Sequence, residues 1–184
     1  MRKLIYAINV TLDGYFDHTN MTADEEMLEY HTHLIRAAGL FVYGRKTYQL
    51  MAPYWPDIAK NRSGTKAEID FAEEFDSKDK VVFSKTLNST DARNTRIVRA
   101  NLQDEILKLK QESGKDIFVG GVDIPSQLTE LGLVDEYHFV VHPVLAGKGR
   151  RLFEGNSLPK KLRLKLVDSK ILKSGCVALR YVKP

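Results

Sequence analysis

The sequence predicts an α/β domain with a mostly parallel sheet and an antiparallel hairpin at its C-terminal edge. Two observations support this fold class. Short apolar runs typical of buried strands alternate with helical patterns along most of the chain, as in sheets whose parallel strands are joined by helices. Two alternating segments near the end, 161–171 and 176–183, flank a Lys-Ser-Gly turn and predict an antiparallel pair.

The first strand is expected over 2–10, which is apolar and β-prone on both faces. A helix should follow over 23–38, because Thr22 and Glu25 form a capping-box pattern and Gly39 is a stop signal. Apolar residues recur along this segment at helical spacing, so one face of the helix should be buried.

A second strand over 40–43 runs directly into Gly44, where another helix should begin. Pro53 and Pro56 are expected to end that helix, because proline cannot continue the hydrogen-bond ladder. The polar segment 63–75 predicts a further helix on the surface of the domain.

The second half of the chain continues the alternation. A helix is expected between the capping residue Asn101 and Glu112, with Gly114 ending it. The remaining strands are expected at 80–83, 95–99, 116–119 and 135–144, with a helix between the last two that ends near Leu131.

The 184 residues suffice for a single domain, 1–184, with a sizeable core. The net charge is +4, but Lys and Arg are spread along the chain without a block, so a nucleic-acid partner is not indicated. A basic pocket for an anionic cofactor accounts for the excess more economically.

The single cysteine, Cys176, excludes a disulfide framework and a cysteine-rich metal site within the chain. The N-terminal residues lack the apolar core of a signal peptide, and no apolar stretch reaches membrane-spanning length. We therefore expect a cytoplasmic protein without a membrane partner.

Three predicted strands end in residue types that suit phosphate groups: cations, hydroxyls and glycines that let backbone approach closely. In chain order they are Gly44, Arg45, Lys46 and Thr47, then Ser84, Lys85 and Thr86, then Gly120 and Gly121. Each cluster alone is also compatible with a tight turn or solvated basic residues. Together, at the carboxyl edge of a parallel sheet, they favour a dinucleotide with an extra ribose phosphate, such as NADPH.

Two other segments admit two interpretations each, and a third admits one. Asp13 and Gly14 follow the first strand, either as a ligand contact or as a plain turn. Trp55 lies between two prolines, where it could cap a pocket over a flat ring or pack on the core. The loop 145–153 is rich in glycine and basic residues, which is typical of a flexible surface turn.

Motifs for other chemistries are absent from the sequence. There is no nucleophile elbow, phosphate-binding P-loop, His-Glu-x-x-His pair or Gly-x-Gly-x-x-Gly fingerprint. His31 and His33 are two residues apart, so they face different sides of a helix and cannot share a metal there. Nucleophilic catalysis and metal-dependent hydrolysis therefore have no positive support.

The order of several short motifs resembles the dihydrofolate reductase superfamily. These motifs are Leu-Asp-Gly after the first strand, Val-Tyr-Gly-Arg-Lys-Thr-Tyr at 42–48, Phe-Ser-Lys-Thr at 83–86 and Phe-Val-Gly-Gly at 118–121. The runs at 132–136 and 142–149, with Leu152 and Phe153, are similar to the C-terminal reductase domain of the bifunctional riboflavin-biosynthesis deaminase/reductase. The zinc signature of the deaminase half is absent.

This resemblance implies a three-layer α/β/α domain with a mixed sheet of roughly eight strands. It also implies NADPH across the carboxyl ends of the strands, and often a homodimer. The residues it assigns to the cofactor are Ala7, Gly44, Arg45, Lys46, Thr47, Ser84, Lys85, Thr86, Gly120, Gly121 and Val122. Those it assigns to the small-molecule substrate are Asn9, Asp13, Gly14, Tyr48 and Trp55.

The implied activity is hydride transfer from NADPH to a C=N or C=O carbon of a small heterocycle, for example 5-amino-6-(5-phosphoribosylamino)uracil. Asp13 is the expected catalytic residue, as a polar substrate contact that relays a proton. No carboxylate on the first helix aligns with the one that holds the pterin in dihydrofolate reductases, which argues against dihydrofolate. The alternative is a non-catalytic module that binds or senses NADPH.

Overall fold

The computed structural model describes residues 1–21, 24–92, 94–153 and 161–184. The strands are β1 (Leu4–Thr11), β2 (Ala38–Gly44), β3 (Asp79–Phe83), β4 (Thr95–Val98), β5 (Asp116–Val119), β6 (Glu136–His142), β7 (Lys165–Ile171) and β8 (Val177–Val182). The helices are α1 (Glu25–Ala37), α2 (Arg45–Met51), α3 (Trp55–Asn61), α4 (Lys66–Ser77), α5 (Leu102–Gln111) and α6 (Asp123–Glu130), with a 3₁₀ turn, η1, at His18–Asn20.

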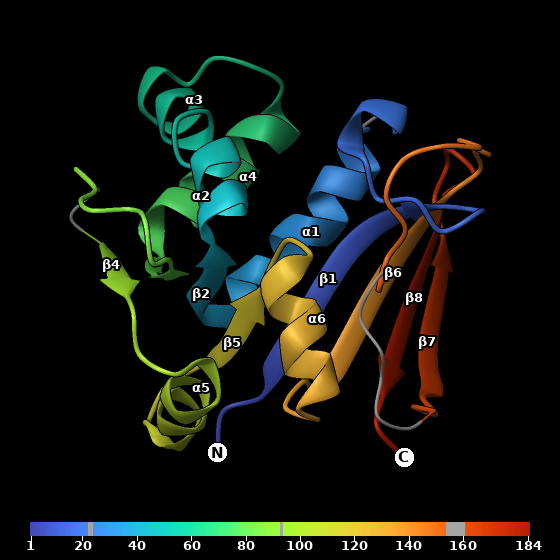
Figure 1. Cartoon of the computed structure of the whole chain (residues 1–184). Helices are drawn as coiled ribbons and strands as arrows, with labels where there is room; N and C mark the ends of the chain where they lie inside the picture. Colours follow the sequence, from blue (N-terminus) through green and yellow to red (C-terminus); the bar gives the residue numbers. More distant parts are fainter. Residues whose placement is uncertain (22–23, 93, 154–160) are drawn as a thin grey trace.

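The described strands form one eight-stranded sheet in the order β4-β3-β2-β5-β1-β6-β8-β7 (Figure 1). The first six strands along the chain are parallel to one another. β8 runs antiparallel to β6, and β7 antiparallel to β8. The predicted fold class, a mostly parallel mixed sheet with a C-terminal antiparallel hairpin, is confirmed.

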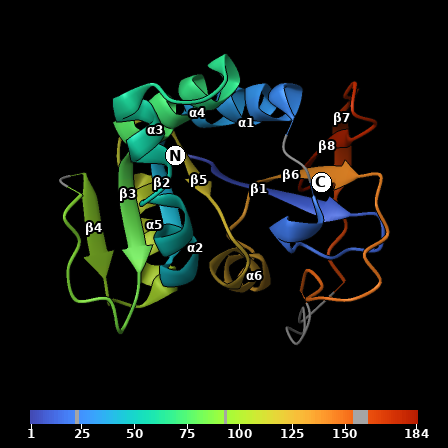
Figure 2. The same cartoon turned by 90° about the horizontal axis from the view of Figure 1, so that it is seen from above.

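Helices cover both faces of the sheet, which gives three layers (Figure 2). Alternating side chains along β2 supply both cores, because successive residues of a strand point to opposite faces. Phe41 and Tyr43 pack in the cluster that includes residues of α1 and α4. Leu40 and Val42 pack in the cluster that includes residues of α5 and α6. The central strands are therefore apolar on both faces.

The first helix differs from the prediction at both ends. Its N-cap is Asp24, whose side chain accepts a hydrogen bond from the backbone N–H of Met27. The predicted cap, Thr22, lies outside the described residues. Gly39 does not stop the helix but belongs to β2, next to a register shift against β5. A Cβ at Gly39 would lie 3.1 Å from Cβ of Lys115, so glycine serves close strand packing there.

The two prolines near Trp55 have different effects. α2 ends at Met51, before Pro53, as predicted. Pro56, however, lies in the first turn of α3, a helix that the sequence analysis missed. Proline is tolerated in a first turn because its missing N–H has no intrahelical partner there. No helix in the described parts of the chain is long and apolar enough to cross a membrane.

The strand register places the carboxyl ends of the central strands at one edge of the sheet. Gly44 at the end of β2 pairs with Phe83 of β3, and Thr11 of β1 pairs with His142 of β6. The loops that follow these strands, and the loop after β5, therefore emerge together.

Candidate functional site

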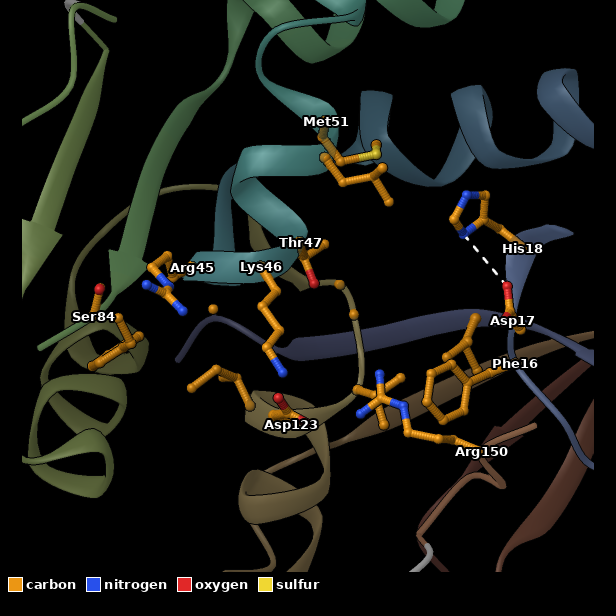
Figure 3. Close-up of a pocket in the computed structure, with 18 of the residues that line it drawn as sticks. Phe16, Asp17, His18, Arg45, Lys46, Thr47, Met51, Ser84, Asp123 and Arg150 are labelled. Carbon is orange, nitrogen blue, oxygen red and sulfur yellow. Dashed lines mark ion pairs between the residues drawn. The ribbon is translucent and has the colours of Figure 1, made fainter. Parts of the chain in front are cut away.

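A cleft of about 730 Å³ opens at this carboxyl edge (Figure 3). Its walls come from the strand ends, the first turns of α2 and α6, the segment after β1, and the connection between β6 and β7. The lining residues are Ile8, Asn9, Phe16, Asp17, His18, Met21, Gly44, Arg45, Lys46, Thr47, Leu50, Met51, Phe83, Ser84, Lys85, Thr86, Gly120, Gly121, Val122, Asp123, Ile124 and Arg150.

The structure brings together all three strand-end clusters that the sequence singled out. Each residue of the clusters lines this one cleft: Gly44, Arg45, Lys46, Thr47, Ser84, Lys85, Thr86, Gly120, Gly121 and Val122. The clusters lie far apart in the sequence and meet because β3, β2 and β5 are parallel neighbours in the sheet. Their role in binding a cofactor stays a prediction.

The two consecutive glycines after β5 permit a very close approach between chain segments. Gly121 has a φ of +87°, and a Cβ there would lie 2.1 Å from Oγ1 of Thr47. A Cβ at Gly120 would lie 2.6 Å from the Tyr43 ring. Only glycine fits either position, and Gly121 also needs a backbone conformation that other residues rarely adopt. Backbone without side chains consequently forms this part of the cleft wall.

Cationic side chains give the β2–β3 side of the cleft its charge. Arg45, Lys46 and Lys85 all line it, and within the described residues none of them forms an ion pair. Figure 3 shows Arg45 and Lys46 on α2, with Ser84 beside them at the end of β3. Oγ of Ser84 accepts hydrogen bonds from the backbone N–H groups of Thr86 and Leu87, which shapes this turn. Asp123 lines the same cleft, but cations that form no ion pair still favour an anionic ligand.

Asn9, a predicted substrate contact, lines the middle of the cleft at the end of β1. Its Oδ1 accepts a hydrogen bond of 3.0 Å from Nε2 of His31 on α1. The NH₂ group of Asn9 is therefore not used in this contact. Burial, and to a smaller extent the charges of His138 and His142, lower the pKa of His31 to about 4. A neutral His31 therefore orients the Asn9 amide, a role that no local sequence pattern could indicate.

Asp13, the predicted catalytic residue, does not line the cleft. Its carboxylate accepts hydrogen bonds from Oγ1 of Thr11 at 2.6 Å and from the backbone N–H groups of Ala146 and Gly147 at 3.1 and 2.8 Å. The Thr11 hydrogen bond and the two backbone donors lower the pKa of Asp13 to about 2. An ionised carboxylate whose oxygens are occupied in this way anchors a loop and cannot donate a proton.

Four other predicted residues also lie outside the cleft lining. Ala7 is buried in the core between the sheet and α1. Gly14 belongs to the turn after β1, with a φ of +83°. Tyr48 is buried, and its hydroxyl group lies 2.5 Å from Oγ1 of Thr90. Trp55 packs on Phe71 with 4.5 Å between ring centroids, so the interpretation of Trp55 as a core residue fits the structure.

The end of the cleft beside β1 and β6 is built from residues that the sequence analysis missed. Phe16, Asp17, His18, Met21 and Arg150 line it, and Leu50 and Met51 of α2 are further lining residues that the analysis missed. Arg150 lies over Phe16, with Cζ 4.8 Å from the ring centroid (Figure 3). Arg150 comes from the glycine-rich loop that was interpreted as a flexible surface turn. Its only sequence signal was two adjacent arginines.

Comparison with known sequences decides the family. The family model described as RibD C-terminal domain matches residues 2–178. The chain belongs to the RibD C-terminal domain family. A curated relative, the uncharacterized protein YyaP of Bacillus subtilis (strain 168), is 33% identical over 184 residues, which cover 98% of this chain and 94% of YyaP.

Solved structures share the fold of this RibD C-terminal domain. A diaminohydroxyphosphoribosylaminopyrimidine deaminase/5-amino-6-(5-phosphoribosylamino)uracil reductase from Thermotoga maritima superposes with a TM-score of 0.68 at 14% identity, over 100% of this chain and 57% of that one. Dihydrofolate reductase from Enterococcus faecalis, solved in complex with NADP(H), gives a TM-score of 0.63 at 10% identity, over 98% and 96% of the two chains. The resemblance to dihydrofolate reductases is therefore confirmed for the fold.

Proposed function

We propose that this protein is an NADPH-dependent reductase that transfers hydride to a C=N or C=O carbon of a small heterocycle. The observation that carries the proposal is the convergence of three phosphate-compatible strand ends on one cleft, with three cations that form no ion pair among the described residues. Membership of the RibD C-terminal domain family supports a reductase role.

Each of the three strand-end clusters has a chemical task in this proposal. Arg45, Lys46 and Thr47 would hold phosphate groups, and Lys85 would meet the ribose 2′-phosphate. The backbone at Gly120 and Gly121, where no side chain intervenes, would lie along the pyrophosphate. When bound, NADPH supplies the hydride, while the protein positions the reactants and excludes water.

The proposed substrate class includes 5-amino-6-(5-phosphoribosylamino)uracil, the compound named for the Thermotoga maritima reductase. Dihydrofolate is disfavoured because no described carboxylate of α1 lines the cleft. Glu26, for example, accepts a hydrogen bond from the backbone N–H of Lys173 and pairs with Lys170 at 3.1 Å. Glu26 therefore serves the contact of this helix with the C-terminal hairpin.

The proposal is tested by the loss of NADPH absorbance when the purified protein is mixed with this pyrimidine and with a panel of small cyclic imines. We expect oxidation of NADPH that depends on one of these substrates. The alternative, a module that binds NADPH without turnover, is favoured by one observation: Asp13 is ionised and lies outside the cleft lining. Tight NADPH binding with no oxidation by any compound of the panel would establish that alternative and reject the reductase.

A homodimer stays a prediction. All seven residues of the outer strand β7 are exposed, among them Leu166, Val167 and Ile171. An exposed edge strand with apolar side chains is the kind of surface that a second copy can cover.

A further inference from the structure

We infer that Arg150, stacked on Phe16, forms a second anion subsite in the cleft and binds a phosphate or carboxylate substituent of the substrate. The inference rests on the proposed function, because it takes the β2–β3 side of the cleft for the cofactor and the β1–β6 side for the substrate. It adds a residue that neither the sequence motifs nor the strand-end clusters indicated.

The charge of Arg150 is available for a ligand. Its guanidinium group lies over the Phe16 ring and forms no ion pair with any described carboxylate. Asp17, the acidic neighbour in the cleft, feels the charge of Arg150 but forms no ion pair with it. Its Oδ1 accepts hydrogen bonds from the backbone N–H and Oγ1 of Thr19 and lies 3.9 Å from Nδ1 of His18. Stacking occupies the flat face of a guanidinium group and leaves the N–H groups at its edge free to bind oxygen.

The loop that carries Arg150 is held against the segment after β1. Asp13 accepts hydrogen bonds from the backbone N–H groups of Ala146 and Gly147, as described above. The backbone N–H of Phe16 donates to the carbonyl oxygen of Arg150 at 3.3 Å. The same two residues that stack are therefore also joined through the backbone, so the cation is directed into the cleft.

Backbone pairing continues on both sides of this contact. The backbone N–H of Leu152 donates to the carbonyl oxygen of Gly14 at 3.1 Å, and that of Leu12 donates to Val144 at 2.9 Å. Tyr15 and Arg151 form an antiparallel β-bridge. A segment paired at this many points is no flexible surface turn. Asp13 thus acts as a positioning residue for Arg150.

Arg150 comes from a different part of the sheet edge from the other cations of the cleft. Arg45 and Lys46 follow β2, whereas Arg150 follows β6, and β5 and β1 lie between these strands. Three strand spacings, roughly 14 Å, separate β2 from β6. Figure 3 shows Arg150 and Phe16 across the cleft from Arg45 and Ser84. Because Arg45 and Arg150 come from opposite sides of the cleft, the Arg150 site suits a different group of the bound molecules from the one that Arg45 meets.

Two matched pairs of probes test the inference without requiring turnover: uridine monophosphate against uridine, and orotate against uracil. Each pair differs by one anionic group, a phosphate or a carboxylate. Binding is measured by calorimetry to protein saturated with NADP⁺, for the wild type, Arg150→Gln and the control Lys148→Gln. Lys148 lies in the same loop and has the same charge, but does not line the cleft.

We expect the wild type to bind the anionic member of at least one pair about tenfold more tightly or better, since charge-assisted hydrogen bonds are the stronger ones. Arg150→Gln should abolish this preference and leave the affinity for NADP⁺ unchanged, and Lys148→Gln should retain both. Asp13→Asn should reduce the preference, because the loop loses its anchor. The pair that shows the preference identifies the anionic group.

Several results would overturn the inference. They are equal binding within both pairs, no binding of any of the four probes, a preference that survives Arg150→Gln, or an equal loss in Lys148→Gln. A loss of NADP⁺ affinity in Arg150→Gln would assign Arg150 to the cofactor instead. Failure of the wild type to bind NADP⁺ would reject the proposed function, and the same probes added to the ligand-free protein would still test Arg150.

Discussion

Asp13 shows how far the role of one side chain can be predicted from its neighbours in the sequence. The Asp-Gly pair after β1 indicated a carboxylate at the ligand-binding edge of the sheet. Asp13 does lie at that edge, but its oxygens are taken by Thr11 and by two backbone N–H groups more than 130 residues away. Those distant donors decide that it anchors a loop.

The low pKa of Asp13 predicts how its contribution to stability depends on pH. Its folded-state pKa of about 2 lies below the ordinary value of 3.8, so folding favours the ionised form. The stabilisation is therefore fully present above about pH 4 and is lost as the pH falls towards about 2. Urea unfolding should show that Asp13→Asn is less stable than the wild type at neutral pH, with a difference that shrinks over this acidic range. A difference that is constant with pH would contradict the assignment.

At the scale of the elements, two glycines are explained by the close approach of a neighbouring chain segment. The helical and strand patterns of the sequence could not explain them. Gly39 was taken for the end of a helix, yet it lets β2 pack beside Lys115. Gly121 was expected to admit a ligand, and it also admits Thr47 of α2. Local sequence identifies a glycine that departs from its pattern, but only the neighbouring element shows what the missing side chain makes room for.

Alanine variants of two glycines with positive φ distinguish two contributions to the unfolding free energy. One is the strain of the left-handed backbone conformation, and the other is a steric clash of the new Cβ. Gly132→Ala should cost about 1–2 kcal/mol of unfolding free energy for the left-handed conformation alone, because no atom lies within 4 Å of the new Cβ. Gly121→Ala should cost more, because its Cβ overlaps Oγ1 of Thr47. Adding Thr47→Ala should recover part of that excess. Equal unfolding free energies for Gly121→Ala and Gly132→Ala in urea titrations would refute the close approach.

At the scale of the whole molecule, the order of strands in the sheet assembles the cleft. β3, β2, β5, β1 and β6 are neighbours although the chain visits them in a different order. Their parallel register puts five strand ends at one edge, and each end contributes residues or a loop to the binding surface. The cleft is consequently cationic at both ends, with Arg45, Lys46 and Lys85 on one side and Arg150 on the other.

This arrangement predicts a preference between cofactors. Replacing Arg45 and Lys85 by Ala should weaken NADPH binding about tenfold or more, and NADH binding less, because the lost charges would face the additional phosphate. Dissociation constants for both cofactors, measured by fluorescence titration, test this. Lys108→Ala on α5 is the matched control, since Lys108 is exposed and does not line the cleft. Equal losses for NADPH and NADH would show that neither residue reads the 2′-phosphate.

The sequence by itself determined the fold class and the three strand-end clusters. Period-two and period-3.6 patterns are local, and parallel strands necessarily end at the same edge, so Gly44–Thr47, Ser84–Thr86 and Gly120–Gly121 could be assigned to one site. Only the tertiary structure decided which polar groups face one another. The anchoring of Asp13, the orientation of Asn9 by His31 and the direction of Arg150 all depend on contacts between segments distant in the chain. Such contacts follow from strand order and packing, which no local pattern encodes.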